Sequence, residues 1–402
     1  MTEKLYYQVP ILESCAATVL ACEKKEEGFE VLLDRTVVYP EGGGQLSDKG
    51  FIDNVAVLHA REENDLVWHK TEASFEVGAK VVVRLDIETR LDHSAQHTGE
   101  HILSGIAKTM FDTANVGFHM AEDYVTIDLD KFLDDAQLEA LERAANLAVQ
   151  NNIPVTVRVV DEHALENIPL RKQAKGLTGE IRIVTVGEAD SCTCCGTHCA
   201  MSGEVGTIKI TAAAKYKGGT RIWFACGMRA VEASRREHML VDALARRFST
   251  KPEEVYDAVK KQGDEYATLR AELKKRTEAL LEMQAEELLK NAKIAKGIKV
   301  IVHAAQGLST QELRAFSEKL LAGGKTVVAL FGVNGDTASY VLARSADVGF
   351  SMRQACEATN ALFKGKGGGR DDSAQGSAPI AGESGFYQAV SQFEGYLLRA
   401  VS

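Results

Sequence analysis

Two motifs, far apart in the chain, carry side chains that together could bind a metal ion. His97 and His101 are separated by three residues, so both imidazoles lie on one face if the segment is helical. Cys194 and His198 repeat this spacing around Gly196, a residue that favours a tight turn. Three imidazole nitrogens and one thiolate suit tetrahedral zinc. We call these four ligand candidates the quartet, and together they predict a metal site.

Neighbouring residues leave the ligand set open at several points. Cys192 and Cys195 lie close enough in sequence to replace the cysteine of the quartet. His93 lies one helical turn before His97, so the metal could use either successive pair of histidines; otherwise His93 is an outer hydrogen-bond partner or an exposed side chain. Glu100 is either a general base beside the metal or a solvated helix carboxylate.

Hydrophobic periodicity predicts the elements that must position these motifs. One helix over residues 90–110 carries the histidines, and a second follows over 138–148, capped at Asp134 or Asp135. Short, regularly spaced strands before residue 85 predict a small barrel, and the mixture that follows predicts an α+β layered domain. The predicted strands cover residues 29–33, 55–58, 81–85, 155–160, 181–186, 208–210 and 221–227.

The last third of the chain changes character twice. Residues 232–296 are highly charged, and their apolar residues recur in alternating steps of three and four, which predicts a helical hairpin or coiled-coil connector. This connector fits a dimer interface or a spacer arm equally well. From Lys299 a strand–helix–strand–strand pattern, then a helix over 352–364, a glycine motif and a helix over 386–398 predict a compact α/β domain.

These motifs resemble one protein family. Residues 97–104 and 194–198 resemble the two halves of the zinc motif in the editing domain of alanyl-tRNA synthetase, which the free-standing AlaX alanyl-tRNA editing proteins share. Residues 34–45, followed by Asp48 and Gly50, resemble the glycine-rich editing loop of that family. The resemblance runs through nearly the whole chain in the family's order, and it fits the long form, AlaX-L.

The C-terminal glycine motif also fits this resemblance. Residues 367–370, with Ala374 and Gln375, resemble the glycine motif of the DHHA1 domain found in the synthetase and in DHH-type phosphoesterases. Phosphoesterase chemistry is not expected, because Asp92-His93-Ser94 lacks the second histidine of a D-H-H signature. The cationic motif directly before a helix would suit a phosphate backbone. The expected nucleic-acid contacts are Lys364, Lys366, Gly367, Gly368, Gly369 and Arg370.

The resemblance implies an ATP-independent aminoacyl-tRNA hydrolase. It would remove serine, and glycine as a second substrate, from mischarged tRNA(Ala), with Zn²⁺ held by His97, His101, Cys194 and His198. The expected catalytic loop residues are Thr36, Gly43, Gly44 and Gln45, of which Thr36 and Gln45 would contact the seryl hydroxyl or the scissile carbonyl. The alternative is a zinc- and tRNA-binding module without catalysis.

Fold class and domains follow from these elements. We expect an α+β multidomain protein with a barrel-like domain over residues 1–88, a zinc-binding editing domain over 89–231, a helical connector over 232–297 and a DHHA1-like tRNA-binding domain over 298–402. A homodimer through the connector or the C-terminal domain is part of this prediction.

Composition sets the compartment. The 402 residues carry a net charge of −10 and no apolar run long enough for a membrane span, and the N-terminus lacks a signal-peptide pattern. Four of the eight cysteines crowd into residues 192–199, which in a reducing compartment indicates metal ligation or redox chemistry. We therefore expect a cytoplasmic protein with no membrane partner. The negative charge argues mildly against nucleic acid, but only the contacting surface must be basic.

Overall fold

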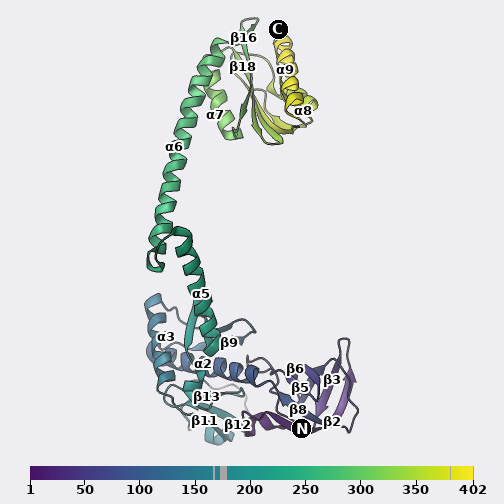
Figure 1. Ribbon diagram of the computed structural model, residues 1–402, viewed down its shortest axis with the longest axis vertical. Helices are drawn as coiled ribbons and strands as arrows, with labels where there is room; N and C mark the ends of the chain where they lie inside the picture. The colour runs from purple at the N-terminus through teal and green to yellow at the C-terminus, as the bar shows by residue number, and fades with distance from the viewer. Residues whose placement is uncertain (166–167, 173–178, 381, 402) are drawn as a thin grey trace. The chain divides into compact units, whose positions relative to one another are not determined.

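The computed structural model describes residues 1–165, 168–172, 179–380 and 382–401, and it consists of two compact units, Met1–Pro252 and Glu253–Ser402 (Figure 1). Both units combine helices with β-sheets, so the predicted α+β multidomain class is confirmed. No helix in these described ranges combines the length and apolar composition needed to cross a membrane.

The first unit begins with a closed barrel of antiparallel strands. Apolar residues alternate along each strand, so that in β8 the side chains of Val81, Val83 and Leu85 fill the interior. A short parallel pair, β1 (Glu3–Lys4) with β4 (Arg35–Thr36), lies outside this barrel order. In barrel order the strands are β2 (Ser14–Lys24), β3 (Phe29–Leu33), β7 (Leu66–Thr71), β6 (Val55–Glu63), β5 (Gly50–Ile52) and β8 (Lys80–Leu85).

Helix α2 (Ile87–Phe111) follows the barrel directly and carries the histidines. Asp86 caps it by accepting a hydrogen bond from the Thr89 amide (3.1 Å), and Asp112 ends it in a left-handed conformation. Helix α3 (Asp135–Gln150) packs beside α2 and begins at the predicted cap, where Asp134 and Gln137 form a reciprocal capping box.

Two sheets surround α2 and α3. The first has the order β14-β15-β10-β9 and contributes Ile127, Ile208 and Phe224 to the core that α2 also fills. The second has the order β11-β12-β13 and leads into the cysteine-rich segment. Their bounds are β9 (Asn115–Met120), β10 (Val125–Leu129), β14 (Ile208–Tyr216), β15 (Gly219–Cys226), β11 (Val155–Val160), β12 (Ile181–Val186) and β13 (Asp190–Thr193), and α5 (Gly227–Phe248) follows β15.

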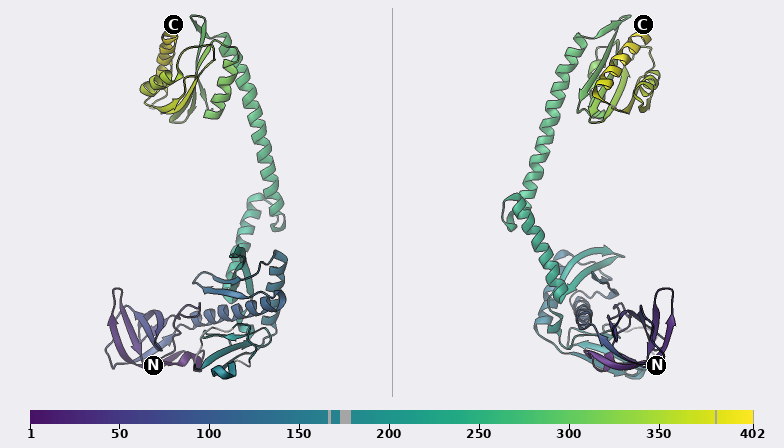
Figure 2. Two further views of the ribbon diagram at one scale, coloured as in Figure 1. Left: turned by 180° about the vertical axis from the view of Figure 1, so that it is seen from behind. Right: turned by 45° about the vertical axis from the view of Figure 1, so that its right-hand side comes forward.

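The second unit is an α/β/α sandwich around one mixed sheet. Helix α7 and the end of α6 pack on one face through Phe316 and Leu281, whereas α8 and α9 cover the other through Phe363 and Phe393 (Figure 2). The strand order is β16-β17-β18-β19-β21-β20. The elements are α6 (Val255–Lys290), β16 (Lys293–Ala295), β17 (Ile298–Gln306), α7 (Thr310–Leu321), β18 (Thr326–Asn334), β19 (Thr337–Arg344), α8 (Met352–Phe363), β20 (Lys366–Gly369), β21 (Ser373–Pro379) and α9 (Glu383–Ala400).

The glycine motif of this unit differs from the prediction. It forms the edge strand β20, which pairs with β21 through Gly367 opposite Gly376 and Gly369 opposite Ala374. The expectation that a helix follows the motif directly is therefore wrong. Close packing explains the glycine, because a side chain at Gly367 would collide with the Tyr340 hydroxyl and the Gln375 carbonyl. One side of the motif's backbone is thus paired in a hairpin. Lys366 lies on this edge strand, whereas Lys364 caps α8 and Arg370 follows the strand.

The apolar seam predicted for the connector lies on α6. Val255 is buried, whereas Val259, Tyr266, Leu269, Leu273, Leu280 and Met283 are exposed within the described chain. These side chains recur at the spacing of one helix face.

Candidate metal centre

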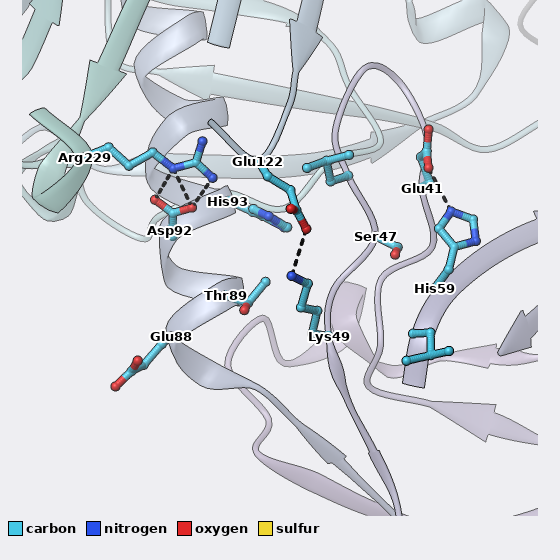
Figure 3. Close-up of a pocket in the computed structure, with 12 residues that line it drawn as sticks. Glu41, Ser47, Lys49, His59, Glu88, Thr89, Asp92, His93, Glu122 and Arg229 are labelled. Carbon is cyan, nitrogen blue, oxygen red and sulfur yellow. Dashed lines mark hydrogen bonds and ion pairs between the residues drawn. The ribbon is translucent and has the colours of Figure 1, made fainter. Parts of the chain in front are cut away.

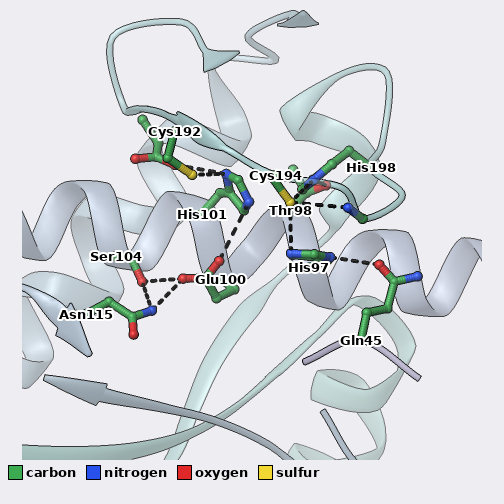
Figure 4. A network of polar contacts seen from close by, with 12 residues as sticks. Gln45, His97, Thr98, Glu100, His101, Ser104, Asn115, Cys192, Cys194 and His198 are labelled. Carbon is green, nitrogen blue, oxygen red and sulfur yellow. Dashed lines mark hydrogen bonds and ion pairs between the residues drawn. The ribbon is translucent and has the colours of Figure 1, made fainter. Parts of the chain in front are cut away.

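The structure brings the quartet together in the interior of the first unit (Figure 4). α2 presents His97 and His101 on one face, and the segment after β13 returns Cys194 and His198 to it. One donor atom from each of the four residues lies within 4.8 Å of the other three. The Cys194 Sγ lies 3.4 Å from His97 Nε2 and 3.3 Å from His198 Nε2. A tetrahedron built with usual Zn–S and Zn–N bond lengths has edges of about 3.6 Å, so the donor set fits zinc.

Each histidine of the quartet is oriented by a partner at its other ring nitrogen. His97 Nδ1 donates to Gln45 Oε1 (2.7 Å), and His101 Nδ1 donates to Asp190 Oδ2 (2.8 Å). His198 Nδ1 pairs with Thr98 Oγ1 (3.2 Å). An amide or carboxylate oxygen accepts only, so it fixes the proton on Nδ1 and leaves the Nε2 lone pair free. This arrangement of outer partners is typical of metal-binding histidines.

The charges around the quartet favour a thiolate. Burial opposes ionisation of Cys194, but the imidazoles of His97, His198 and His101 outweigh it and hold the pKa of the thiol well below its usual range. Burial lowers the pKa of His198 to about 3, so its ring is neutral. Burial opposes the protonation of His101 as well, but Cys192, Cys194 and Asp190 outweigh it and raise the pKa of that ring, so zinc binding at its Nε2 would displace a proton.

The other cysteine candidates lie elsewhere. Cys192 Sγ faces the outer nitrogen of His101, 3.6 Å from Nδ1, where it forms a second group with Asp190. Arg171 pairs with Asp190 and neutralises it. Cys195 is exposed, and its backbone carbonyl accepts a hydrogen bond from the Tyr7 hydroxyl. Of the three cysteines, the thiol of Cys194 therefore has the geometry of a fourth ligand.

Glu100 is not a solvated carboxylate. It is buried, and its Oε1 accepts hydrogen bonds from Ser104 and Asn115, both 2.6 Å long. Its Oε2 lies 3.7 Å from His101 Nε2, on the side of the ring that faces the quartet. The alternative of a solvated carboxylate is therefore wrong, because α2 is covered by protein around most of its circumference.

The glycine loop, residues 39–48, is joined to the quartet through Gln45. Besides accepting from His97, Gln45 Oε1 accepts from the Thr197 amide (3.0 Å), and Gln45 Nε2 donates to the Thr197 hydroxyl (2.9 Å). These three contacts leave one amide hydrogen of Gln45 free for another partner. The side chain is fully buried, and it links two loops that are distant in sequence.

Two glycines make this junction possible. Gly44 has φ of +87°, and a β-carbon there would lie 2.7–2.8 Å from Phe118, whose ring stacks on His97. A β-carbon at Gly196 would overlap the His97 ring. The glycine at position 196 therefore permits close approach to His97, and it lies at a bend of the chain. Gly43 has φ of +62° and faces open space.

Thr36 is buried beneath the loop with a partner that sequence reasoning missed. Its hydroxyl lies 2.8 Å from His69 Nε2 and accepts from the Val38 amide (3.1 Å). His69 Nδ1 faces the Val31 carbonyl (3.2 Å), so this ring carries its proton on Nδ1 and accepts from Thr36 at Nε2. The alternation of Val67, His69 and Thr71 along β7 was the available signal that His69 points inward.

This pairing predicts an acid-sensitive step in stability. Burial lowers the pKa of His69 from its ordinary 6.5 to about 4, so the unfolded chain takes up the proton first. The neutral His69 ring makes its full contribution to the free energy of unfolding above about pH 6.5. As the pH falls towards 4, about 3 kcal/mol of this contribution is lost. Urea unfolding followed by tryptophan fluorescence should show the free energy of unfolding rising with pH between about 4 and 6.5, and His69→Gln should flatten this dependence. An unchanged slope in His69→Gln, with the exposed His238→Gln as control, would contradict the prediction.

A buried ion pair anchors the glycine loop to α2. Arg90 Nε donates to Asp48 Oδ2 (3.0 Å), and Arg90 Nη2 donates to the Val37 carbonyl (2.7 Å). Asp48 also accepts from the Tyr39 amide (2.7 Å). Arg90 is 1% exposed and Asp48 is fully buried. Both ends of the loop are thereby fixed to the helix that carries the histidines.

The remaining predicted residues lie outside the quartet. His93 is buried on α2 and belongs to neither of the metal-ligand groups found in the described chain. Lys364, Lys366 and Arg370 are exposed in the second unit, at the end of α8 and around β20. A cavity of about 490 Å³ lies there, lined by Gly368, Gly369 and Arg370 together with Arg314 and Arg344.

Comparisons with known proteins give matches to family models and to individual relatives. Segments of the chain match the tRNA synthetases class II (A) family over residues 5–89, the threonyl and alanyl tRNA synthetase second additional domain over 181–222, and the DHHA1 domain over 297–397. The alanyl-tRNA editing protein AlaX-L of Pyrococcus horikoshii is 30% identical, and the alignment covers 99% of this chain and 100% of that protein.

Other relatives are matched over part of their length. The alanyl-tRNA editing protein Aarsd1 of Bos taurus is 34% identical over 59% of this chain and 55% of its own. The alanine–tRNA ligase of Halorubrum lacusprofundi is 30% identical over 94% of this chain and 42% of its own. The crystal structure of the C-Ala domain from Aquifex aeolicus alanyl-tRNA synthetase aligns at 23% identity and a TM-score of 0.25, over 27% of this chain and 97% of that domain.

Proposed function

The chain belongs to the alanyl-tRNA editing protein family, and from this premise we propose that it hydrolyses the ester that joins serine to mischarged tRNA(Ala), with glycine as a second substrate and without ATP. The observation that carries the proposal is the junction at Gln45, which joins the glycine loop directly to a complete metal-ligand set. A site of this kind can bring an ester, a metal and polar side chains together.

Recognition of serine is the physical problem that such a site must solve. Serine is alanine with one added hydroxyl, and an apolar pocket rejects an added hydroxyl poorly. Thr36 donates its own proton to His69, so its oxygen can only accept from a ligand. We assign it to the seryl hydroxyl, which donates. Alanine would leave this acceptor unpaired, at a cost of about 1–3 kcal/mol, which is tenfold or more in rate.

The quartet would hold zinc through three Nε2 atoms and one thiolate. With all four ligands in place, zinc would be coordinatively closed and would orient the loop; with one ligand displaced, it would polarise the ester carbonyl or lower the pKa of a bound water. Around it, the remaining amide hydrogen of Gln45 is available to the carbonyl oxygen. Glu100 Oε2 is free to take a proton from the attacking water, since its other oxygen is held by Ser104 and Asn115. Gly43 leaves the rim of the loop open to the ester.

The second unit would supply affinity for tRNA. We propose that Lys364, Lys366 and Arg370, with the backbone of Gly367, Gly368 and Gly369, contact the sugar–phosphate backbone, and that Arg314 and Arg344 extend this surface across the adjoining cavity. The same proposal divides the chain into four domains, with boundaries after residues 88, 231 and 297. A homodimer is supported by the exposed seam on α6, which suits a spacer equally well.

The test is deacylation of tRNA(Ala) charged with serine, glycine or alanine by the purified protein. Fast loss of serine, slower loss of glycine and little loss of alanine are expected. Absence of hydrolysis by the zinc-loaded protein, despite measurable tRNA affinity, would replace this proposal with the binding-module alternative.

Replacing Thr36 by valine should lower the serine-over-alanine ratio of kcat/KM about tenfold, because the acceptor is lost while shape is kept. Thr36→Ser retains the hydroxyl and is the matched control. Equal ratios in Thr36→Val and the wild type, measured with the same charged tRNAs, would exclude Thr36 as the residue that recognises serine.

A further inference from the structure

An arginine that the proposed function leaves unused holds the backbone of residues 194–198, which we call the metal loop. Arg182 lies on β12 beside the start of this loop, where its own carbonyl accepts a hydrogen bond from the Cys194 amide (3.1 Å). Its Nη1 donates to the carbonyl of Cys194 (2.8 Å) and to that of Gly196 (2.9 Å). One guanidinium thus binds the loop at two points, on either side of Cys195.

A tyrosine binds the carbonyl between these two points. Tyr7 lies on the short helix α1 (Leu5–Gln8), which connects β1 to the barrel. Its hydroxyl donates to the Cys195 carbonyl (2.9 Å). The Arg182 guanidinium lies over the Tyr7 ring, 5.1 Å from its centroid, in the geometry of a cation–π contact. Three successive carbonyls of the metal loop are therefore bound by two side chains that also contact each other.

The hydroxyl of Tyr7 also determines where the next amide of the loop points. In a trans peptide the carbonyl and the N–H point in opposite directions. The Cys195 carbonyl points towards Tyr7, so the N–H of the same peptide, which belongs to Gly196, points towards the quartet. It donates to the Cys194 sulfur, 3.3 Å away. A hydrogen bond at sulfur stabilises the thiolate, which is the form that binds zinc.

Arg182 has the same effect one peptide further along. It holds the Gly196 carbonyl, and the N–H on the opposite side of that peptide belongs to Thr197. This N–H donates to Gln45 Oε1 (3.0 Å), the oxygen that also accepts from His97. The direction of the Thr197 amide, and with it the position of Gln45, therefore follows from where Arg182 holds the loop.

The glycine loop depends on the contacts of Gln45 because a cavity separates part of the loop from α2 (Figure 3). The cavity has a volume of about 440 Å³, and Ser47 lines it from the loop and Thr89 from the helix. Side-chain packing therefore does not fix the loop along this stretch. Polar contacts do so instead, among them the ion pair of Asp48 with Arg90 and the contacts of Gln45. Whatever orients the amide that Gln45 accepts from thus also positions the glycine loop.

We propose that Arg182 and Tyr7 are positioning residues of the metal centre. By holding three carbonyls away from the quartet, they direct one amide of the metal loop to the ligand sulfur and the next to Gln45. The loop is then ordered before a metal arrives, which lowers the entropy cost of binding. The inference rests on the proposed function for the identity of the metal, zinc, but it does not require that the protein hydrolyse an ester.

Zinc affinity is the first measurement, because it needs neither tRNA nor catalysis. Tyr7→Phe removes one hydroxyl and keeps the ring, and Arg182→Met removes the guanidinium and keeps an unbranched side chain. Each variant should weaken zinc binding about tenfold, measured by competition with a chelator, as is usual when a group that orients metal ligands is lost. Arg182→Lys, which can still donate to one carbonyl, should recover part of the affinity. Tyr124→Phe and Arg84→Met, at exposed positions of the first unit, are the matched controls and should bind zinc as the wild type does.

Cobalt(II) bound in place of zinc gives a signature that a merely structural role would not produce. Its sulfur-to-metal charge-transfer absorption shifts to lower energy when the thiolate loses a hydrogen bond. Tyr7→Phe should therefore move this band to longer wavelength, whereas Tyr124→Phe should leave it in place. Urea unfolding of the metal-free proteins, followed by tryptophan fluorescence, should show the first unit of each variant still folded.

Zinc affinity and a cobalt band at wild-type values in both Tyr7→Phe and Arg182→Met would overturn the inference. So would a loss of zinc affinity that merely follows a lower urea stability of the metal-free variants. Deacylation of seryl-tRNA(Ala) by the same samples separates the two proposals. Weaker zinc binding by the variants of a protein that hydrolyses no ester would support the positioning role and reject the proposed function. Hydrolysis of the ester combined with unchanged zinc affinity in the variants would reject the positioning role alone.

Discussion

His101→Ala is expected to remove the bound metal and to lower kcat/KM for seryl-tRNA(Ala) by about a thousandfold. The reason is that a metal ion supplies several kcal/mol of transition-state stabilisation, and each 1.36 kcal/mol is a factor of ten. His101 is held on its outer side by Asp190 and in turn by Arg171, so its Nε2 is fixed towards the quartet and its loss removes one of the four ligands. Elemental analysis and deacylation rates measure the two effects on the same sample.

The cysteines give this experiment a matched pair. Cys194→Ser should lose zinc, whereas Cys195→Ser should retain both zinc and activity, because the Cys194 sulfur alone of the two lies within the group of donor atoms. Full zinc occupancy in Cys194→Ser, combined with loss of zinc in Cys192→Ser, would show that Cys192 supplies the sulfur ligand, in the group that it forms with His101 and Asp190.

Arg90→Met should destabilise the first unit by about 3–5 kcal/mol, because it leaves the Asp48 carboxylate buried without its counter-charge. The chain has two tryptophans, Trp68 and Trp223, and both lie in the first unit. Their fluorescence during urea unfolding therefore reports on that unit separately from the second.

Two further variants identify the cause of the stability lost in Arg90→Met. Arg84→Met, at an exposed arginine of the barrel, should cost less than about 1 kcal/mol. The double variant Arg90→Met, Asp48→Leu should be more stable than Arg90→Met alone, because no charge is then left buried. A cost for Arg90→Met as small as that of Arg84→Met would show that the ion pair does not fix the glycine loop.

The sequence predicts the parts of this molecule that local spacing determines. The paired histidines and the cap at Asp134 follow from helical geometry, which neighbouring residues establish. The choice of Cys194 over Cys192 depends instead on how the hairpin of β12 and β13 turns its side chains towards α2, and three cysteines in four positions carry no such information.

Long-range pairs lie beyond that kind of reasoning. Asp48 and Arg90 are separated by 42 positions, and Gln45 and Thr197 by 152. Nothing local marks them as partners. The strand at β21 was missed for another reason: its sequence from Ser373 to Pro379 contains no β-branched or aromatic residue, so pairing with β19 rather than intrinsic preference makes it a strand.

The hydrogen bond from His97 to Gln45 has a thermodynamic consequence. Since the same amide oxygen holds the Thr197 backbone, occupancy of the quartet and order of the glycine loop share a free energy of coupling. Such coupling is reciprocal, so a substrate that orders the loop must tighten the hold on the metal by the same factor as the metal improves substrate binding. The protein would therefore release its metal most readily when no acylated tRNA end occupies the loop. Slow exchange of the bound metal would then mark a protein that is turning over substrate.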